Sequence, residues 1–240
     1  MRAFIELENE DGMMNTAEQD RGLSFNDAAL TAGFGLLLMV MCAPPAFFYF
    51  LPQGSVEGDA AATVTALQTT GGTPYLIGAF LLFCTYCLDI LVAWALYWLV
   101  RPGQAAFAQL VGWTRLVYAA LAFVGLIFTF QVYDLATSAE LAATLGDPAL
   151  QNAVMAKLNS ANAATAFALF FFGFHLVTLG IAVFRSRDIP NWLGVLLILA
   201  GLSYILMHIQ RYAAPDLAVD WLLIFSMGEL VFMIWMIFTG

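Results

Sequence analysis

Charged residues are scarce in this sequence. Only 10% of its 240 residues are Asp, Glu, Lys or Arg, against roughly 25% in an average soluble domain. This scarcity excludes a soluble globular enzyme and a disordered chain. The eight Lys and Arg residues are outnumbered by 17 Asp and Glu residues, so there is no basic patch to hold the phosphates of a nucleic acid.

Cysteine and N-terminal basic residues are scarce as well. The three cysteines, Cys42, Cys84 and Cys87, lie within apolar runs. We predict buried free thiols rather than a disulfide framework. The stretch before the first apolar run is acidic, whereas a secretory signal begins with basic residues. We therefore expect residues 1–27 to form an acidic cytoplasmic segment and the first apolar run to remain in the membrane.

Long apolar runs fill the rest of the chain, which is 62% hydrophobic overall. A membrane helix needs about 20 apolar residues. Six such helices are predicted, at about 28–50, 74–100, 105–133, a fourth ending near residue 184, 190–210 and 217–238. The fold class is therefore an all-α bundle of six transmembrane helices, forming one domain over residues 28–240.

Local signals refine these helices. Ser24 with Asp27 resembles a capping box, Thr73 and Asp188 are expected to be N-caps, and Pro44-Pro45 should kink the first span. In the long connection before the fourth span, apolar residues recur four apart at 150, 154 and 158. This spacing predicts a helix that lies against the membrane or its neighbours.

The positions of Lys and Arg predict the orientation. With a cytoplasmic N-terminus, five arginines lie inside and only Lys157 and Arg211 lie outside. The five are Arg2, Arg21, Arg101, Arg185 and Arg187. Because cytoplasmic loops are rich in Lys and Arg, we expect both termini inside. The expected location is the bacterial inner membrane, where the lipids are the first partners.

Four ionisable residues lie deep within the predicted spans: Asp89, Arg115, His175 and Glu229. Each costs about 2.5–3.5 kcal/mol to insert, and such residues are functional candidates by default. Asp89 and Arg115 each lie 13 residues from Pro102 in the turn between spans two and three. An antiparallel hairpin therefore brings them to one level, and all four fall roughly 16–20 Å from the inner helix ends. We infer one buried cluster facing the bundle interior.

The composition of this cluster suits a site for a proton or a small ligand. Asp89, Glu229 and Arg115 sum to a charge of −1 when His175 is neutral, and one added proton balances the sum. Tyr86, Tyr118 and Ser226 are expected to support the four residues. The alternative is structural: Asp89–Arg115 would fix the hairpin, while Glu229 and His175 would bond to each other and to these hydroxyls.

No cofactor or metal is expected. Two haem-ligating histidines would have to share one depth, but His208 lies 18 residues beyond Pro190, about 27 Å from the inner end and well above His175. His208 is instead expected to join Gln210, Arg211 and Tyr212 in an interfacial cap. A zinc site of His175, Asp89 and Glu229 would be opposed by the adjacent Arg115.

Several short segments occur together in a characteristic order. They are Leu88-Asp89-Ile90, Arg115-Leu116-Val117-Tyr118, Phe172-Gly173-Phe174-His175-Leu176, Ile189-Pro190 with Leu193-Gly194, and Gly228-Glu229-Leu230. In this order they resemble the bacterial membrane family called domain of unknown function 4386. The resemblance implies a six-helix inner-membrane protein and Asp, Arg, His and Glu positions at 89, 115, 175 and 229. It implies no reaction, and the acidic N-terminus and Cys84/Cys87 depart from the pattern.

Three functions remain open. The first is a protein that binds or moves a small solute, lipid or proton through the midplane cluster, with a homodimer plausible at 26.2 kDa. The second is an accessory or scaffold subunit of a larger membrane complex. The third is an intramembrane enzyme acting on a lipid or quinone.

Overall fold

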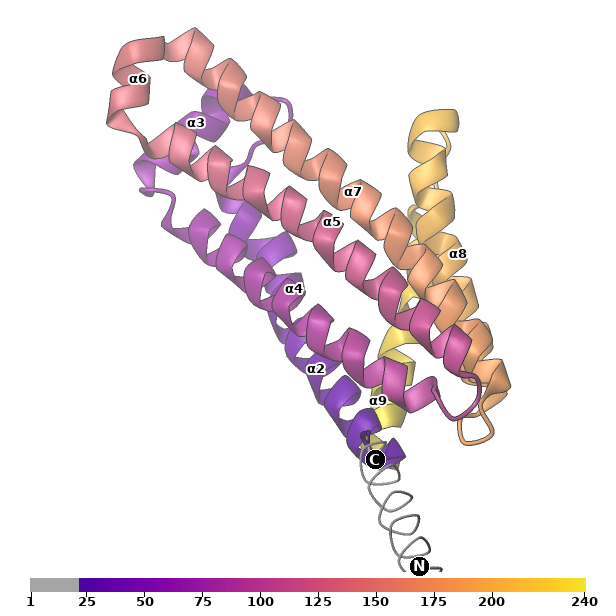
Figure 1. Cartoon of the computed structure of the whole chain (residues 1–240). Coiled ribbons are helices and arrows are strands. Elements are labelled where there is room, and N and C mark those ends of the chain that lie inside the picture. Colours follow the sequence, from indigo (N-terminus) through magenta and orange to yellow (C-terminus); the bar gives the residue numbers. More distant parts are fainter. Residues whose placement is uncertain (1–21) are drawn as a thin grey trace, which may run out of the picture.

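The computed structural model describes residues 22–240, and all the regular secondary structure in that range is helical (Figure 1). Most of the predicted acidic segment 1–27 lies outside the described residues. Six helical segments are long and apolar enough to cross a membrane, which confirms the expected fold class. The first span is α2 (Phe25–Pro45) with the helical segments that follow it as far as Gly54. The next four spans are α4 (Thr73–Val100), α5 (Ala105–Thr137), α7 (Asp147–Arg185) and α8 (Asn191–Ala213). The last span consists of the 3-10 segment η3 (Asp220–Ser226) and α9 (Met227–Thr239).

The six spans form a closed ring in chain order. Each span packs against the next, and α9 returns to pack against α2. At this closing seam, Gly33 of α2 adjoins Ile237 of α9, and Gly240 adjoins Leu30. The C-terminus therefore lies beside the start of α2 (Figure 1).

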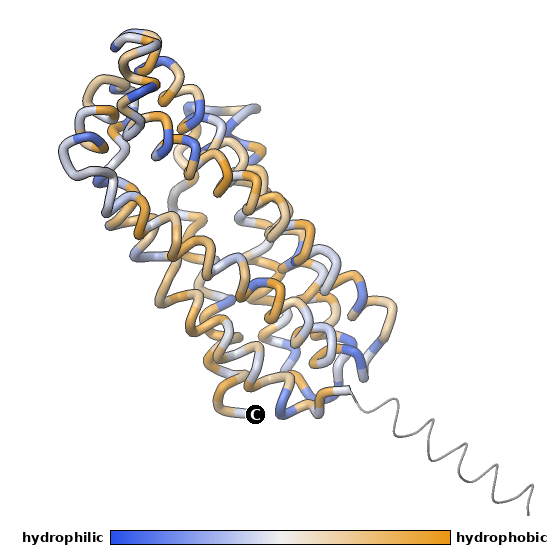
Figure 2. Tube along the Cα trace, turned by 60° about the vertical axis from the view of Figure 1, so that its left-hand side comes forward, coloured by the Kyte–Doolittle hydropathy of each residue, from blue (hydrophilic) through white to orange (hydrophobic). Residues whose placement is uncertain are grey.

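The two ends of the bundle differ. The start of α2, the C-terminus and the α4–α5 and α7–α8 turns share one end, and Figure 2 shows apolar residues along the bundle with hydrophilic residues gathered mainly at its ends. Arg101, Arg185 and Arg187 lie in or beside these two turns. The start of the first span and the C-terminus thus lie on one side with these arginines, while the direction across the membrane stays a prediction.

A small helical lobe occupies the other end. It comprises α3 (Ala60–Thr69), α6 (Ala139–Leu145) and the adjoining ends of α5 and α7 (Figure 1). The 33 residues of α5 and 39 of α7 span about 50 and 58 Å, beyond the hydrocarbon thickness of about 30 Å. Leu150, Val154 and Leu158 form a second core here with Val64 and Leu67, so the predicted four-residue spacing marks packing against neighbours.

The first span changes helix type where a kink was predicted. Pro44 and Pro45 lie inside α2, a π-helical segment η1 (Ala46–Phe50) follows, and a 3-10 turn η2 (Leu51–Gly54) ends the span. Since proline has no N–H, the carbonyls of Val40 and Met41 lose their usual donors four residues on. The next N–H along the chain, that of Ala46, is shared between the carbonyls of Cys42 and Ala43. The wider turn continues the span after this interruption.

Some local predictions were right and others wrong. Ser24 accepts a hydrogen bond from the N–H of Asp27, as the capping box predicts. Gly72, with φ of 67°, and Pro190 occupy the positions predicted for Thr73 and Asp188 as N-caps. The cysteines are free, but Cys84 and Cys87 are exposed on a membrane span rather than buried, because they lie on the outer face of α4.

Glycines allow α7 and α8 to approach closely. Gly173 faces Gly201, and seven residues along each helix Gly180 faces Gly194. A Cβ at any of the four would come within 2.5–2.8 Å of the opposite glycine's carbonyl oxygen. Small residues of this kind let membrane helices meet backbone to backbone. The seam fixes the position of α7 on both sides of His175.

We predict that Gly201→Ala destabilises the protein. The new Cβ would lie 2.5 Å from the Gly173 carbonyl oxygen, and overpacking of this kind costs about 1–3 kcal/mol. Thermal unfolding in mild detergent, followed by tryptophan fluorescence, measures the change. Gly112→Ala is the matched control, because its Cβ would meet nothing closer than 3.7 Å. Equal melting temperatures for the two variants would contradict a close-packed seam.

Candidate functional site

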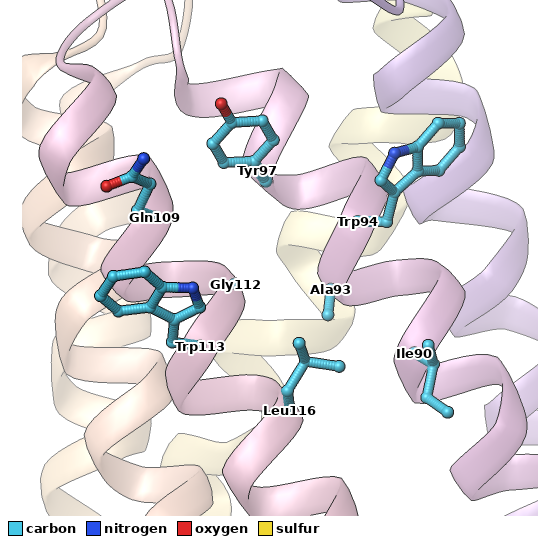
Figure 3. A pocket seen from close by; sticks show the side chains of 8 residues that line it. All are labelled: Ile90, Ala93, Trp94, Tyr97, Gln109, Gly112, Trp113 and Leu116. Atoms are coloured by element: carbon cyan, nitrogen blue, oxygen red, sulfur yellow. The ribbon is translucent and has the colours of Figure 1, made fainter.

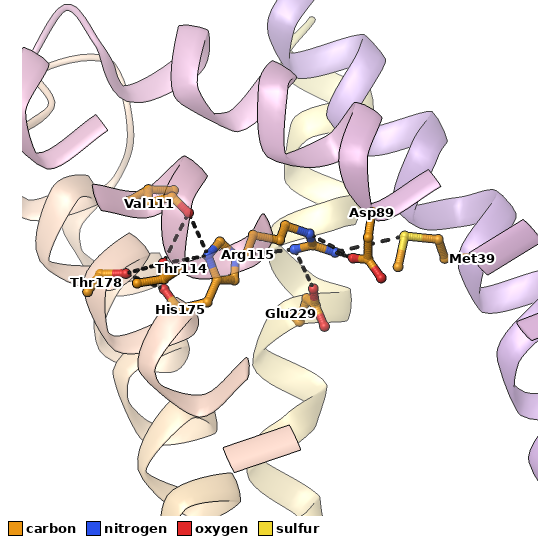
Figure 4. Close-up of polar contacts among 8 residues, drawn as sticks. All are labelled: Met39, Asp89, Val111, Thr114, Arg115, His175, Thr178 and Glu229. Atoms are coloured by element: carbon orange, nitrogen blue, oxygen red, sulfur yellow. Dashed lines mark hydrogen bonds and ion pairs between the residues drawn. The ribbon is translucent and has the colours of Figure 1, made fainter. Parts of the chain in front are cut away.

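The structure brings Asp89, Arg115, His175 and Glu229 into contact (Figure 4). They lie on α4, α5, α7 and α9, respectively. Arg115 extends from α5 between the other three side chains (Figure 4). The equal distances of Asp89 and Arg115 from Pro102 along the chain thus predicted correctly that the two residues lie at the same level. The role of the four residues in binding stays a prediction.

The central interaction is a buried ion pair. Arg115 Nε and Nη2 both reach Asp89 Oδ1, at 2.9 and 2.7 Å, and both side chains are at most 1% exposed. Charge-assisted bonds of this length are the strong ones. Both donors use the same carboxylate oxygen, so Asp89 Oδ2 stays buried with no hydrogen-bond partner among the described residues.

His175 is held through both ring nitrogens. Its Nδ1 lies 3.1 Å from the carbonyl oxygen of Val111, which can only accept, so Nδ1 carries the proton. Its Nε2 lies 3.2 Å from Arg115 Nη1 and accepts from it. Thr114 and Thr178 surround the Nδ1 side, and the Thr178 hydroxyl donates to the His175 carbonyl. The histidine is thus fixed as a neutral acceptor that orients the guanidinium.

Glu229 and Met39 accept the remaining N–H groups of Arg115. Its Oε1 accepts from Arg115 Nη1 at 3.4 Å, and Nη2 also points to the sulfur of Met39 at 3.8 Å. Together with Asp89 and His175, these contacts occupy all five guanidinium N–H groups. Glu229 differs from Asp89 because its side chain is 22% exposed.

That exposure opens onto a cavity of about 450 Å³ in the middle of the ring. Every one of the six spans contributes to its wall. Three residues that touch the guanidinium line it: Met39, Glu229 and Phe172, whose ring lies 5.5 Å from the Arg115 carbon. The other lining residues are Leu36, Val40, Ala43, Pro44, Phe47, Phe48, Thr85, Tyr118, Leu169, Tyr204, Leu223, Ser226, Met227, Leu230 and Met233. The charged cluster therefore lies directly behind one wall of the cavity.

The three hydroxyl residues expected to support the cluster are placed differently. Tyr118 lines the cavity and packs on Phe172. Ser226 also lines it, but its hydroxyl donates to the Leu223 carbonyl. Tyr86 is buried against Phe123, and no hydrogen bond joins it to the cluster within residues 22–240.

Sequence reasoning did not identify Met39, Thr114, Thr178 and Tyr204. Thr178 follows His175 by three residues and Thr114 precedes Arg115, so helical neighbourhood was an available signal for both. For Met39 there was none, because a methionine in an apolar span is ordinary.

A second hollow lies outside the ring, between α4 and α5 (Figure 3). Its volume is about 340 Å³, and its walls include Trp94 and Trp113, which are 49% and 62% exposed. Gln109 is the lining residue with a polar amide, and no charged side chain reaches the hollow in the part of the chain that the structure describes. The groove is therefore suited to lipid chains or to another apolar helix.

His208 lies apart from the cluster. Its Nδ1 bonds to the Ala166 carbonyl on α7 at 3.0 Å, and its ring packs among Phe167, Phe170 and Tyr212. The cap expected at the end of α8 is made by Gln210 instead, whose amide donates to three carbonyls beyond the helix. His208 thus fastens α8 to α7.

The fold and its buried polar centre define an integral membrane protein with six apolar spans. The model of one family, described as a domain of unknown function (DUF4386), matches residues 31–240, and the chain belongs to that family. It is also 30% identical over 165 residues to an uncharacterized protein of Archaeoglobus fulgidus, an alignment covering 69% of this chain and 83% of the relative. No solved structure matches.

We predict different costs for neutralising the two acids. Asp89→Asn removes the charge closest to Arg115 and leaves only Glu229, 3.4 Å away and partly exposed, to compensate the buried guanidinium. Because breaking a close buried pair is costly, we expect a loss of about 3 kcal/mol. Glu229→Gln leaves the Arg115–Asp89 pair neutral overall and keeps an acceptor, so we expect less than about 1 kcal/mol. Denaturation by dodecyl sulfate in mixed micelles gives both values. Equal losses would show that the two acids hold the arginine equally.

Proposed function

We propose that this protein binds or moves a small solute, lipid or proton at a midplane site formed by Asp89, Arg115, His175 and Glu229. One observation carries the proposal: Glu229 belongs both to the buried ionic cluster and to the wall of the central cavity. A purely structural ion-pair network would gain nothing from an opening of this size. Cavities of about 300–1,000 Å³ with a few convergent polar groups are typical ligand sites.

The charge count supports the same proposal. Arg115 compensates one acid, and His175 is held as a neutral acceptor, so Asp89 and Glu229 leave one negative charge. A proton or a cationic ligand restores neutrality, which low-dielectric surroundings favour. In this proposal Glu229 is the acceptor reached from the cavity, while Arg115 is its counter-ion and Asp89 and His175 hold the arginine.

The proposed location is the cytoplasmic membrane of a bacterium, with both termini inside. Arg101, Arg185 and Arg187 mark the end that we assign to the cytoplasm, following the positive-inside rule. The helical lobe would then lie on the outer side. Labelling of single cysteines introduced into the lobe and into the α4–α5 turn tests this orientation.

A second candidate function is an accessory or scaffold subunit of a larger membrane complex. The exposed tryptophans of the α4–α5 groove favour it, because aromatic residues are enriched where proteins meet. Such a subunit would keep the ionic cluster only to fix its helices. A homodimer using this groove is compatible with either function.

We expect native mass spectrometry to find a discrete bound molecule on protein released from its host membrane in mild detergent. Glu229→Gln should lose that molecule, because the variant removes the only charged group on the described cavity wall. Asp134→Asn is the control, since it removes an equal charge from an exposed position on α5 outside the cavity. Retention of the molecule by Glu229→Gln would refute the site. Stoichiometric partner chains without any bound molecule would favour the accessory subunit.

A further inference from the structure

The central cavity has an entrance on the lipid-facing side of the ring. Six of its lining residues are also exposed: Val40, Pro44, Phe47 and Phe48 on the first span and Leu223 and Met227 on the last. Both groups lie within segments that are apolar enough to cross a membrane. The α2–α9 seam closes near the other end, at Gly33 and Gly240. A molecule dissolved in the bilayer therefore has a lateral route to Glu229.

Both sides of this entrance depart from regular α-helix. On one side Pro44-Pro45 and the π-helical η1 interrupt the first span, and on the other the 3-10 segment η3 leads into α9. Interrupted spans in membrane proteins are tolerated where they line a cavity. The irregular backbone and the cavity thus coincide.

The ionic cluster at the polar end of the cavity has unused acceptor atoms, whereas its guanidinium has no unused donor. All five N–H groups of Arg115 are directed at acceptors on other helices. Asp89 Oδ2 has no hydrogen-bond partner among the described residues, and Glu229 accepts a hydrogen bond through Oε1 only. The carbonyl of Val40 receives no helical hydrogen bond from four residues on, because Pro44 has no N–H. An anionic headgroup would find no free donor from the arginine and would be repelled by the excess negative charge. A cation would find free acceptors and would compensate that charge.

The remaining walls suit an apolar cation. The rings of Phe47, Phe48, Phe172, Tyr118 and Tyr204 line the cavity. Aromatic faces attract cations, and they do so most strongly away from water. The volume of about 450 Å³ fits a compact molecule rather than a two-chain phospholipid.

We propose that the cavity binds a lipophilic cation, which enters from the bilayer between α2 and η3 and pairs with Glu229. This proposal rests on the proposed function and adds the class of ligand to it. The aromatic walls would surround the apolar body, while Arg115 and Asp89 hold Glu229 in place behind the cavity wall. The ligand's charge would balance the cluster.

Tetraphenylphosphonium and tetraphenylborate test the proposal, because they share size and shape and carry opposite charges. We expect saturable binding of radiolabelled tetraphenylphosphonium to the purified protein in maltoside detergent, at least tenfold tighter than binding of tetraphenylborate. Glu229→Gln should weaken phosphonium binding at least tenfold, whereas the exposed control Asp134→Asn should leave it unchanged. Ala43→Phe, which fills the cavity without changing any charge, should abolish binding.

Several results would overturn the proposal. One is equal or tighter binding of the borate, and another is undiminished phosphonium binding by both Glu229→Gln and Ala43→Phe. The second variant also keeps the test informative if Glu229→Gln fails to fold. A neutral or anionic native molecule that Glu229→Gln loses would refute the cation class and leave the proposed function standing. Absence of any native molecule and of phosphonium binding would refute both.

Discussion

One buried guanidinium group organises this membrane bundle. Arg115 extends from α5 and reaches Met39 on α2, Asp89 on α4, His175 on α7 and Glu229 on α9. Because each of its N–H groups would be costly to leave unpaired in hydrocarbon, these helices have to present acceptors at one depth. The remaining span, α8, is fixed to α7 by the glycine seam and by the His208 bond instead. The register of the helices across the ring therefore depends on the Arg115 side chain, two glycine pairs and the His208 bond.

A ring closed around a polar centre cannot pack like an apolar core. Six helices of this diameter leave space between them unless large side chains fill it, and the charged cluster occupies only one level of that space. The cavity follows on one side of the cluster, where α2 and the last span diverge and their backbones become irregular. The cavity thus lies at the interruption of the first span, and Pro44 is part of its wall.

Much of this arrangement was readable in the sequence, for definite reasons. Apolar runs gave the six spans, and equal distances from Pro102 placed Asp89 beside Arg115, because helix rise is constant and the turn is tight. Other features depend on how the helices are rotated about their axes, which nearly uniform apolar runs do not encode. The exposure of Cys84 and Cys87 and the contact of Met39 with the arginine are both of this kind. The structure of the helical lobe depends on packing between segments distant in sequence, such as those of Leu67 and Leu150, which local patterns do not encode.

The two acids of the cluster are unequal, and this inequality separates stability from binding. Asp89 is fully buried and lies 2.7 Å from the guanidinium, so it holds the arginine's charge inside the bundle. Glu229 is partly exposed, 3.4 Å away, and attached to the shortest α-helical part of any span. Removing the charge of Glu229 leaves the close Asp89–Arg115 pair, whereas removing the charge of Asp89 leaves Arg115 with only the more distant Glu229. In the proposed function, exchange of a ligand at Glu229 would therefore leave intact the Asp89–Arg115 interaction that holds the helices in register.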